Sequence, residues 1–205
     1  MIWILYFILN IIIMLICYIT NPIVCLFCNE EGELPKIFRM WQTWDDSCNP
    51  RFFILEKVPK FLVYDYDKHY EEYWDTTQDL KEVGRDRCYA RLIDGNFTLK
   101  ERIQRYICRV LWLTRNCAYG FAFWCFGRKI DSKNIVYIKQ ESDCRILYDK
   151  SNNILTRAWT WHDERKLFGK VHLKVYAGWK INDDPGIKQC MIACRIIAFK
   201  FEKSD

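Results

Sequence analysis

A short acidic and histidine-containing stretch, with Asp65, Asp67, His69 and Glu71 at alternate positions, holds the residue types that bind metals. Carboxylate oxygens and imidazole nitrogens are common protein ligands of divalent ions. On a strand these alternate residues would share one face, whereas on a helix Asp65, His69 and Glu72 would do so. A solvated helix face shows the same pattern without a metal. Asp65, His69 and Glu72 are therefore metal candidates only, and no cofactor is predicted.

Two pairs of cysteines have spacings that could indicate a redox or zinc site. Cys25 and Cys28 have the spacing of a redox or zinc half-site, but no second pair completes it. Cys190 and Cys194 fall on an expected strand and would lie about 13 Å apart, too far to share one zinc ion. The total of 11 cysteines is odd, and many lie in apolar runs. This usage indicates buried free thiols in a reducing compartment.

Motifs for nucleophilic catalysis or nucleotide binding are missing from the sequence. The chain has three histidines, and it has no G-x-S-x-G elbow, P-loop or dinucleotide fingerprint. A non-enzymatic protein is therefore favoured over an enzyme.

The N-terminal segment, residues 1–28, has no charged side chain and is almost continuously apolar as far as Ile19. About 20 apolar residues suffice to cross a bilayer as a helix. The segment is interpreted as an uncleaved transmembrane anchor; a buried core helix and a cleaved signal peptide are the alternatives. Basic residues such as Lys36 and Arg39 follow it and none precedes it. This bias predicts a single-pass protein with its N-terminus outside and its C-terminal domain in the cytoplasm.

The remainder divides into three regions, which together predict an α+β fold. Residues 29–62 are predicted as an irregular, aromatic-rich connector, residues 63–130 as a helical basic region, and residues 131–205 as an antiparallel β lobe. At 51% hydrophobic residues the chain is too apolar to be disordered.

Periodicity locates the main elements. Tyrosines and a tryptophan spaced from Tyr66 to Trp74 predict a helix over 64–83, ending at Gly84. A capping box, Thr98 to Glu101, predicts a second helix extending towards Gly127, with a break within 116–120. Strict alternation predicts a strand over 171–181, a turn at 182–186 and a partner strand over 189–201. Residues 146–148 and 154–161 are predicted to form another hairpin.

A basic stretch from Arg85 to Lys129 is the main electrostatic feature, with ten Lys or Arg residues against three acidic ones. Its apolar part, residues 106–126, is interpreted as a surface-lying amphipathic helix, a buried helix, or a second membrane-inserted segment. Anionic lipid is the favoured ligand, with nucleic acid less favoured and a solvated face as the alternative. The candidate lipid or partner contacts are Arg102, Arg105, Arg109, Arg115 and Trp112.

The motif Arg115-Asn116-x-Ala118-Tyr119-Gly120 places a charge and turn-forming residues inside this apolar stretch. Arg115 is expected either to cap carbonyl groups at a helix break or to reach lipid phosphates, because an unpaired buried charge is costly. Asn116, Tyr119 and Gly120 are expected to be structural, with Asn116 and Gly120 supplying a permissive backbone.

Three segments of the chain resemble a family of uncharacterised membrane-anchored proteins of tailed bacteriophages and prophages: 41–45 (WQTWD), 111–121 (LWLTRNCAYGF) and 177–180 (AGWK). Family members often carry Pro where this chain has Cys117. The resemblance implies a phage-infected bacterium as the setting and brings no established activity.

Together these features predict a non-enzymatic phage accessory protein at the host inner membrane, acting through contacts with proteins or anionic lipids. One alternative is a virion or genome-delivery component that meets the membrane. Another is a small metal-dependent enzyme that uses the cluster around Asp65 and His69. The expected partners are the membrane itself and other phage or host membrane proteins.

Overall fold

The computed structural model describes residues 2–43, 46–75, 87–130, 137–141, 144–148, 151–168, 171–181 and 188–201. The chain forms two compact units. The helical unit comprises Ile13–Phe121, and the sheet unit comprises Met1–Ile12 together with Ala122–Asp205. The N-terminal helix α1 (Ile2–Cys25) contributes to both units, so the segment predicted as the anchor is divided between them.

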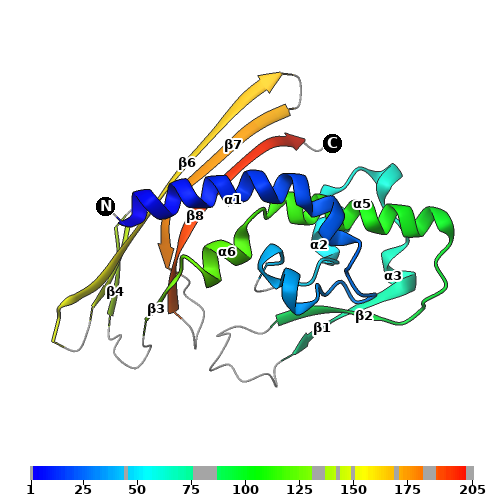
Figure 1. Ribbon diagram of the computed structural model, residues 1–205, viewed down its shortest axis with the longest axis horizontal. Helices are drawn as coiled ribbons and strands as arrows, with labels where there is room; N and C mark the ends of the chain where they lie inside the picture. Colours follow the sequence, from blue (N-terminus) through cyan, green and yellow to red (C-terminus); the bar gives the residue numbers. More distant parts are fainter. Residues whose placement is uncertain are drawn as a thin grey trace. The chain divides into compact units, whose positions relative to one another are not determined.

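The helical unit contains short helices, one long helix and a two-stranded sheet (Figure 1). After α1 its elements are η1 (Lys36–Trp41), α2 (Arg51–Lys57), η2 (Lys60–Leu62), α3 (Tyr66–His69), β1 (Tyr70–Asp75), β2 (Arg87–Leu92) and α5 (Leu99–Arg115). The helix α6 (Tyr119–Trp124) begins in this unit and ends in the other.

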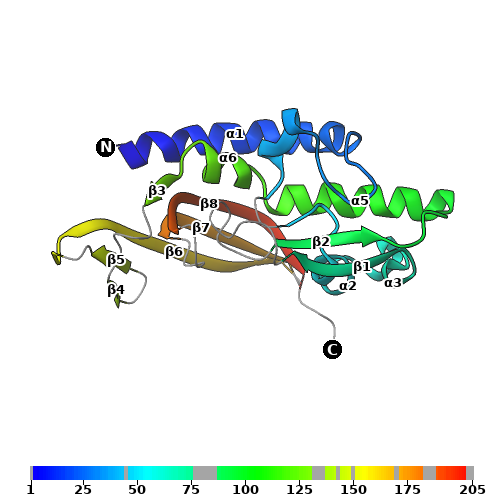
Figure 2. The ribbon, with the colours of Figure 1, turned by 90° about the horizontal axis from the view of Figure 1, so that it is seen from below.

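The sheet unit contains a six-stranded antiparallel sheet in the order β3-β8-β7-β6-β5-β4. The strands are β3 (Arg128–Ile130), β4 (Tyr137–Glu141), β5 (Cys144–Tyr148), β6 (Ile154–Phe168), β7 (Val171–Ile181) and β8 (Lys188–Phe201). Figure 2 shows the long strands β6, β7 and β8 side by side. The α+β class and both predicted strand pairs are confirmed, whereas the predicted turn at 182–186 lies outside the described residues.

Helix α1 is long and apolar enough over Trp3–Cys25 to cross a membrane. It has no acidic residue in its first turn and no basic residue in its last turn, and it continues through Pro22. The predicted N-terminal apolar helix is therefore present.

Helix α5 begins at the predicted capping box. The Thr98 hydroxyl accepts a hydrogen bond from the Glu101 backbone N–H at 3.3 Å, and the Glu101 carboxylate accepts one from the Thr98 backbone N–H at 2.7 Å. These bonds satisfy amide donors that the first turn of a helix leaves unpaired. The helix ends at Arg115, and a turn separates it from α6, which confirms the predicted break.

Low pH is expected to destabilise the fold by weakening the capping box at the start of α5. Hydrogen bonds from the hydroxyl and the N–H of Thr98, followed by one from His69, lower the pKa of Glu101 from 4.5 to about 2. A carboxylate whose pKa is lower in the folded state stabilises the fold above its unfolded pKa, and this stabilisation is lost as the pH falls from about 4.5 to about 2.

The test compares the melting temperatures of the wild type and Glu101→Gln from pH 6 to pH 2. Gln can still serve in a capping box but does not titrate. We expect the wild type to be the more stable protein at pH 6 and the difference to shrink towards pH 2. A difference that stays constant with pH would contradict the role given to the Glu101 charge.

The predicted helix over 64–83 is wrong for the described part of that range. The chain forms one short helix, α3, capped by the Asp65 side chain, and then enters strand β1. β1 pairs with β2 in antiparallel register, with Tyr70 opposite Leu92. This long-range pairing overrides the helical spacing of the tyrosines, whereas residues 76–83 and Gly84 lie outside the described residues.

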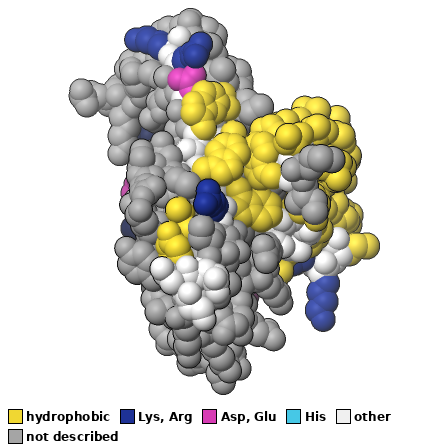
Figure 3. Space-filling model, turned by 90° about the vertical axis from the view of Figure 1, so that its left-hand side faces the viewer, with side chains coloured by type: hydrophobic (Ala, Val, Ile, Leu, Met, Phe, Trp, Pro, Cys, Tyr) yellow, Lys and Arg dark blue, Asp and Glu magenta, His cyan; other side chains and the backbone are white. Residues whose placement is uncertain are grey.

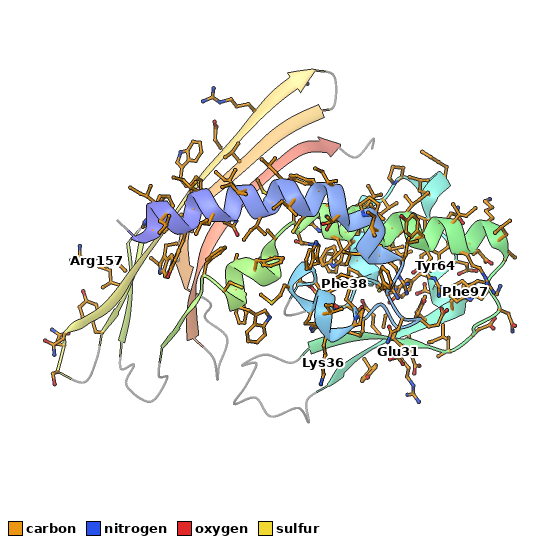
Figure 4. All side chains as sticks on the ribbon, viewed as in Figure 1. Glu31, Lys36, Phe38, Tyr64, Phe97 and Arg157 are labelled. Carbon is orange, nitrogen blue, oxygen red and sulfur yellow. The ribbon has the colours of Figure 1, made fainter. Side chains whose placement is uncertain are left out.

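Aromatic side chains fill the core of the helical unit. Tyr64, Tyr66 and Tyr70 are almost fully buried, and the rings of Tyr64 and Phe97 lie 6.3 Å apart (Figure 4). The His69 ring stacks on Phe97 with the centroids 3.9 Å apart. This packing fixes α3, β1 and the start of α5 relative to one another.

The predicted connector, residues 29–62, is largely ordered and contributes to the same core. Gln42 is fully buried; its side-chain oxygen accepts the Leu34 N–H at 3.0 Å and its amide donates to the Asp46 carbonyl at 2.9 Å. Phe53 and Ile54 of α2 are also buried. Buried amides with satisfied hydrogen bonds explain how a segment with little regular structure is held in place.

Candidate functional site

The outward face of α1 is entirely aliphatic. Within the helical unit its exposed side chains are Leu15, Ile16, Ile19 and Ile23, and Ile19 is 76% exposed. In the part of α1 that belongs to the sheet unit, the exposed side chains include Ile4, Leu5, Ile8 and Leu9. We call these residues, with Ile12, the outer stripe. Contiguous apolar surface of this kind marks a binding surface for protein or membrane.

The inward face of α1 includes two asparagines. Asn10 and Asn21 are each 1% exposed, and Met14, Cys17 and Val24 are buried with them. A helix at the surface of a water-soluble domain instead exposes charged and polar side chains. Polar and small residues at protein contacts with aliphatic residues outward are typical of helices in lipid.

Hydrogen bonds fix the C-terminal half of α1 in the helical unit. The Tyr106 hydroxyl donates to the Pro22 carbonyl at 2.8 Å, and the Cys117 thiol donates to the Met14 carbonyl at 3.2 Å. The Trp41 indole N–H donates to the Thr20 hydroxyl at 2.8 Å. The contacts of Tyr106 and Cys117 show that α5 and the turn after it follow this half of α1 in the antiparallel direction.

The N-terminal half of α1 is fixed in the sheet unit. The Trp3 indole N–H donates to the Gly178 carbonyl of β7 at 3.1 Å, and the Trp3 and Trp159 rings lie 4.7 Å apart. Trp159 and Trp161 of β6 are both exposed, as is Arg157 on the same strand. Figure 3 shows hydrophobic side chains gathered in a band on this side of the molecule, with Lys or Arg side chains beside it.

A second feature is a buried arginine at the centre of the helical unit. Arg109 of α5 is 4% exposed and donates from Nε to the Asn49 side-chain oxygen at 2.8 Å. Its Nη2 donates to the carbonyls of Asn29 and Glu30 at 2.8 and 2.9 Å. Tyr70 donates to the same Glu30 carbonyl at 2.6 Å. These bonds join α5 to the turn that follows α1 and to the loop before α2.

The other predicted contact residues of α5 are also engaged within the protein. Trp112 is 3% exposed, and Arg105 pairs with the Glu30 carboxylate and donates to the Tyr70 hydroxyl at 2.9 Å. Arg102 is exposed and donates to the Phe97 carbonyl at 3.3 Å. The burial of Arg109 and Trp112 corrects the prediction of lipid contacts at these two positions, because both side chains lie in the interior of the helical unit.

The residues of the 115–120 motif make their contacts within the helical unit. The Arg115 guanidinium lies over the rings of Phe53 and Trp112, 5.4 and 5.6 Å from their centroids. Asn116 is buried, and both its backbone N–H and its side-chain amide donate to the Trp112 carbonyl. The Tyr119 N–H donates to the Asn116 carbonyl at 3.0 Å. A cation over aromatic faces is a favourable way to hold a charge that is partly buried.

Gly120 allows the closest approach in this region. A Cβ atom at this position would lie 2.6 Å from the Gln42 carbonyl oxygen and closer still to that of Met40. Real side chains do not tolerate such distances to backbone atoms, so the start of α6 can meet the end of η1 only at a glycine.

The metal candidates do not converge. Asp65 caps α3, and Glu72 accepts the Arg51 backbone N–H at 3.0 Å. The His69 ring nitrogens face the Asp94 carbonyl and the Glu101 carboxylate, at 2.8 and 3.3 Å. Among the described residues no group of three or more His, Cys, Asp or Glu side chains is placed to hold a metal ion.

A thiol pair lies near the buried arginine. The hydrogen bond from Cys48 lowers the pKa of Cys28, and Arg109 acts in the same direction. The same bond and complete burial raise the pKa of Cys48 well above its usual value. Cys28 therefore carries the more acidic thiol of the pair, although the sequence singled it out only through its spacing from Cys25.

Several residues of these sites have no signal in the sequence. Asn49 and Glu30 lie far from Arg109 along the chain, so only the folded structure shows that they hold its guanidinium. Trp159 is one of many aromatic residues, and nothing local indicates its contact with Trp3.

A comparison with known protein families finds a match over residues 1–204. Neither a curated protein nor a solved structure matches the chain. The matching family is described as a family of unknown function, DUF7338, and since the match covers almost the whole sequence, the chain is a member of that family.

Proposed function

We propose that this protein is a non-enzymatic accessory protein that works at a membrane to which α1 attaches it. The observation that carries the proposal is the exposed face of α1, the outer stripe, which is wholly aliphatic while Asn10 and Asn21 are buried. Exposed isoleucine and leucine side chains gain free energy when they leave water for hydrocarbon, at about 25 cal/mol per Å² of apolar surface.

The proposed setting is the inner membrane of a phage-infected bacterium. The resemblance of segments 41–45, 111–121 and 177–180 to phage and prophage proteins supports this setting. The basic residues that follow α1, among them Lys36 and Arg39, support a cytoplasmic position for the domain. The free thiols of buried cysteines, among them Cys48 and Cys108, are compatible with a reducing compartment.

Protein or anionic-lipid contacts are the proposed mode of action. Exposed cationic side chains remain on α5 at Arg102 and on β6 at Arg157 and Lys166. Each Lys or Arg near an anionic membrane surface contributes about 1 kcal/mol of attraction. Arg109 does not contribute to this attraction, because its guanidinium group is buried inside the helical unit.

The experiment compares two charged variants in cell fractionation. Ile16→Asp with Ile19→Asp places two carboxylates in the outer stripe, while Phe61→Asp changes a side chain that is 75% exposed and lies in η2. An aspartate deep in the membrane costs about 3 kcal/mol. The wild type and Phe61→Asp should remain in the membrane pellet after carbonate washing, and the stripe variant should be released while still folded.

Surface substitutions test the proposal better than deletion of α1, because Met14, Cys17 and Val24 belong to the buried interior. A stripe variant that stays in the pellet, or a wild type found in the soluble fraction, would contradict membrane attachment through α1.

A further inference from the structure

The two ends of α1 are held by parts of the chain that carry charged groups. At the N-terminal end, Trp3 contacts β6 and β7, and β6 also carries the exposed Arg157, Arg165 and Lys166. The described sheet has β3 and β4 as its edge strands. An open sheet edge cannot lie in hydrocarbon, because its backbone donors and acceptors would lose their partners. The sheet at this end of α1 must therefore remain in water.

The C-terminal end of α1 is surrounded by a second set of charges. Glu30 and Arg105 pair directly after the helix, and Glu31 and Lys36 are exposed (Figure 4). Asn21 and Pro22, near the end of the helix, bind Cys117 and Tyr106 of the helical unit. This unit must also stay in water, except where its apolar surface meets lipid.

A helix that crosses the bilayer would place these two sets of charges on opposite sides, and the chain would then need a second crossing between the helical unit and β3. The uncharged segment available is residues 116–127, between Arg115 and Arg128. It forms a turn at 116–118 and the six-residue helix α6, whereas a helical crossing takes about 20 apolar residues. This segment is too short for a second transmembrane helix.

We propose that α1 lies along the membrane surface in one leaflet, with its outer stripe in the hydrocarbon and both of its ends on the same side. This proposal rests on the membrane attachment proposed above and specifies its geometry. It also accounts for the absence of charge on α1: a surface helix normally exposes a charged face to water, but here the inward face is covered by the protein itself, at Met14, Cys17 and Asn21.

Each end of the outer stripe has side chains suited to the headgroup region. At the N-terminal end, the exposed Trp159 and Trp161 lie on β6. The same strand exposes Arg157, which is labelled in Figure 4. Tryptophan prefers the membrane interface, and arginine complements anionic phosphate groups. At the C-terminal end the exposed Leu26, Phe27 and Ile37 extend the apolar surface, with Lys36 next to Ile37.

The test locates the two chain termini. The full-length protein carries one epitope before Met1 and a different one after Asp205, and it is expressed in bacteria from which spheroplasts and inverted inner-membrane vesicles are prepared. Protease is added to each preparation. We expect both epitopes to be protected in intact spheroplasts and both to be cleaved in inverted vesicles.

Cleavage of the N-terminal epitope alone in spheroplasts, with the C-terminal epitope protected, would establish a crossing helix and overturn this inference, while membrane attachment itself would stand. Recovery of the protein in the soluble fraction would instead overturn the proposed function. Membrane pelleting of each sample distinguishes the two failures before protease is added.

Discussion

Replacing Arg109 by methionine should lower the free energy of unfolding by about 4 kcal/mol, because it removes three hydrogen bonds from a charged donor, each of which contributes about 1.5–3 kcal/mol, while the cost of burying the charge is also lost. The substitution removes the donor to the Asn49 side chain and to the carbonyls of Asn29 and Glu30. Methionine fills most of the volume, so the loss would reflect the hydrogen bonds rather than a cavity. For a protein of this size the melting temperature should fall by about 10 °C, measured by thermal denaturation in mild detergent.

Arg102→Met on the same helix is the matched control. Arg102 is exposed, and its hydrogen bond to the Phe97 carbonyl is long at 3.3 Å. Exposed substitutions of this kind change stability by about 0.5 kcal/mol or less. If the two variants melted within 2 °C of each other, roughly the effect of that change, Arg109 would not be the centre of the polar network.

Gly120→Ala should destabilise the fold by about 3 kcal/mol and lower the melting temperature by about 8 °C. The added methyl group would meet the backbone carbonyl oxygens of Met40 and Gln42, and backbone cannot rotate away as a side chain can. Relief requires η1 and α6 to move apart, which would also disturb the contact between the Trp41 and Phe121 rings, 5.0 Å apart.

The same substitution at Gly95 supplies the control, because a Cβ atom there would meet only Leu92 Cδ2 at 3.8 Å, an ordinary contact. Gly95→Ala should leave the melting temperature unchanged or raise it slightly, since alanine restricts the unfolded chain. Equal effects at the two glycines would show that α6 and η1 do not pack as closely as described.

Local signals predicted the elements whose determinants lie within a few residues. The capping box at Thr98 and Glu101 predicted the start of α5, and the alternation over 171–181 predicted β7. Asn116 in the 115–120 motif predicted the break between α5 and α6. In each case the backbone and side-chain partners are neighbours in sequence, so the pattern contains the physical cause.

Long-range contacts account for what the sequence did not predict. The tyrosines from Tyr66 to Tyr73 have helical spacing, yet pairing of β1 with β2 places Tyr70 in the core and leaves Tyr73 43% exposed. Arg109 has the spacing of a surface charge, but its partners come from turns far along the chain. A pattern along one helix cannot reveal acceptors that another segment supplies.

The most direct measurement of the central claim, that the outer stripe of α1 seats the protein in lipid, is flotation of the purified full-length protein with liposomes over a range of salt concentrations. We expect the protein to float with zwitterionic liposomes equally well at 50 mM and at about 500 mM salt. Contact of Ile16, Ile19 and their neighbours with hydrocarbon does not depend on salt, whereas attraction between exposed charges more than several ångströms apart is screened at about 500 mM. Failure to float on zwitterionic liposomes, or release at high salt, would contradict the account.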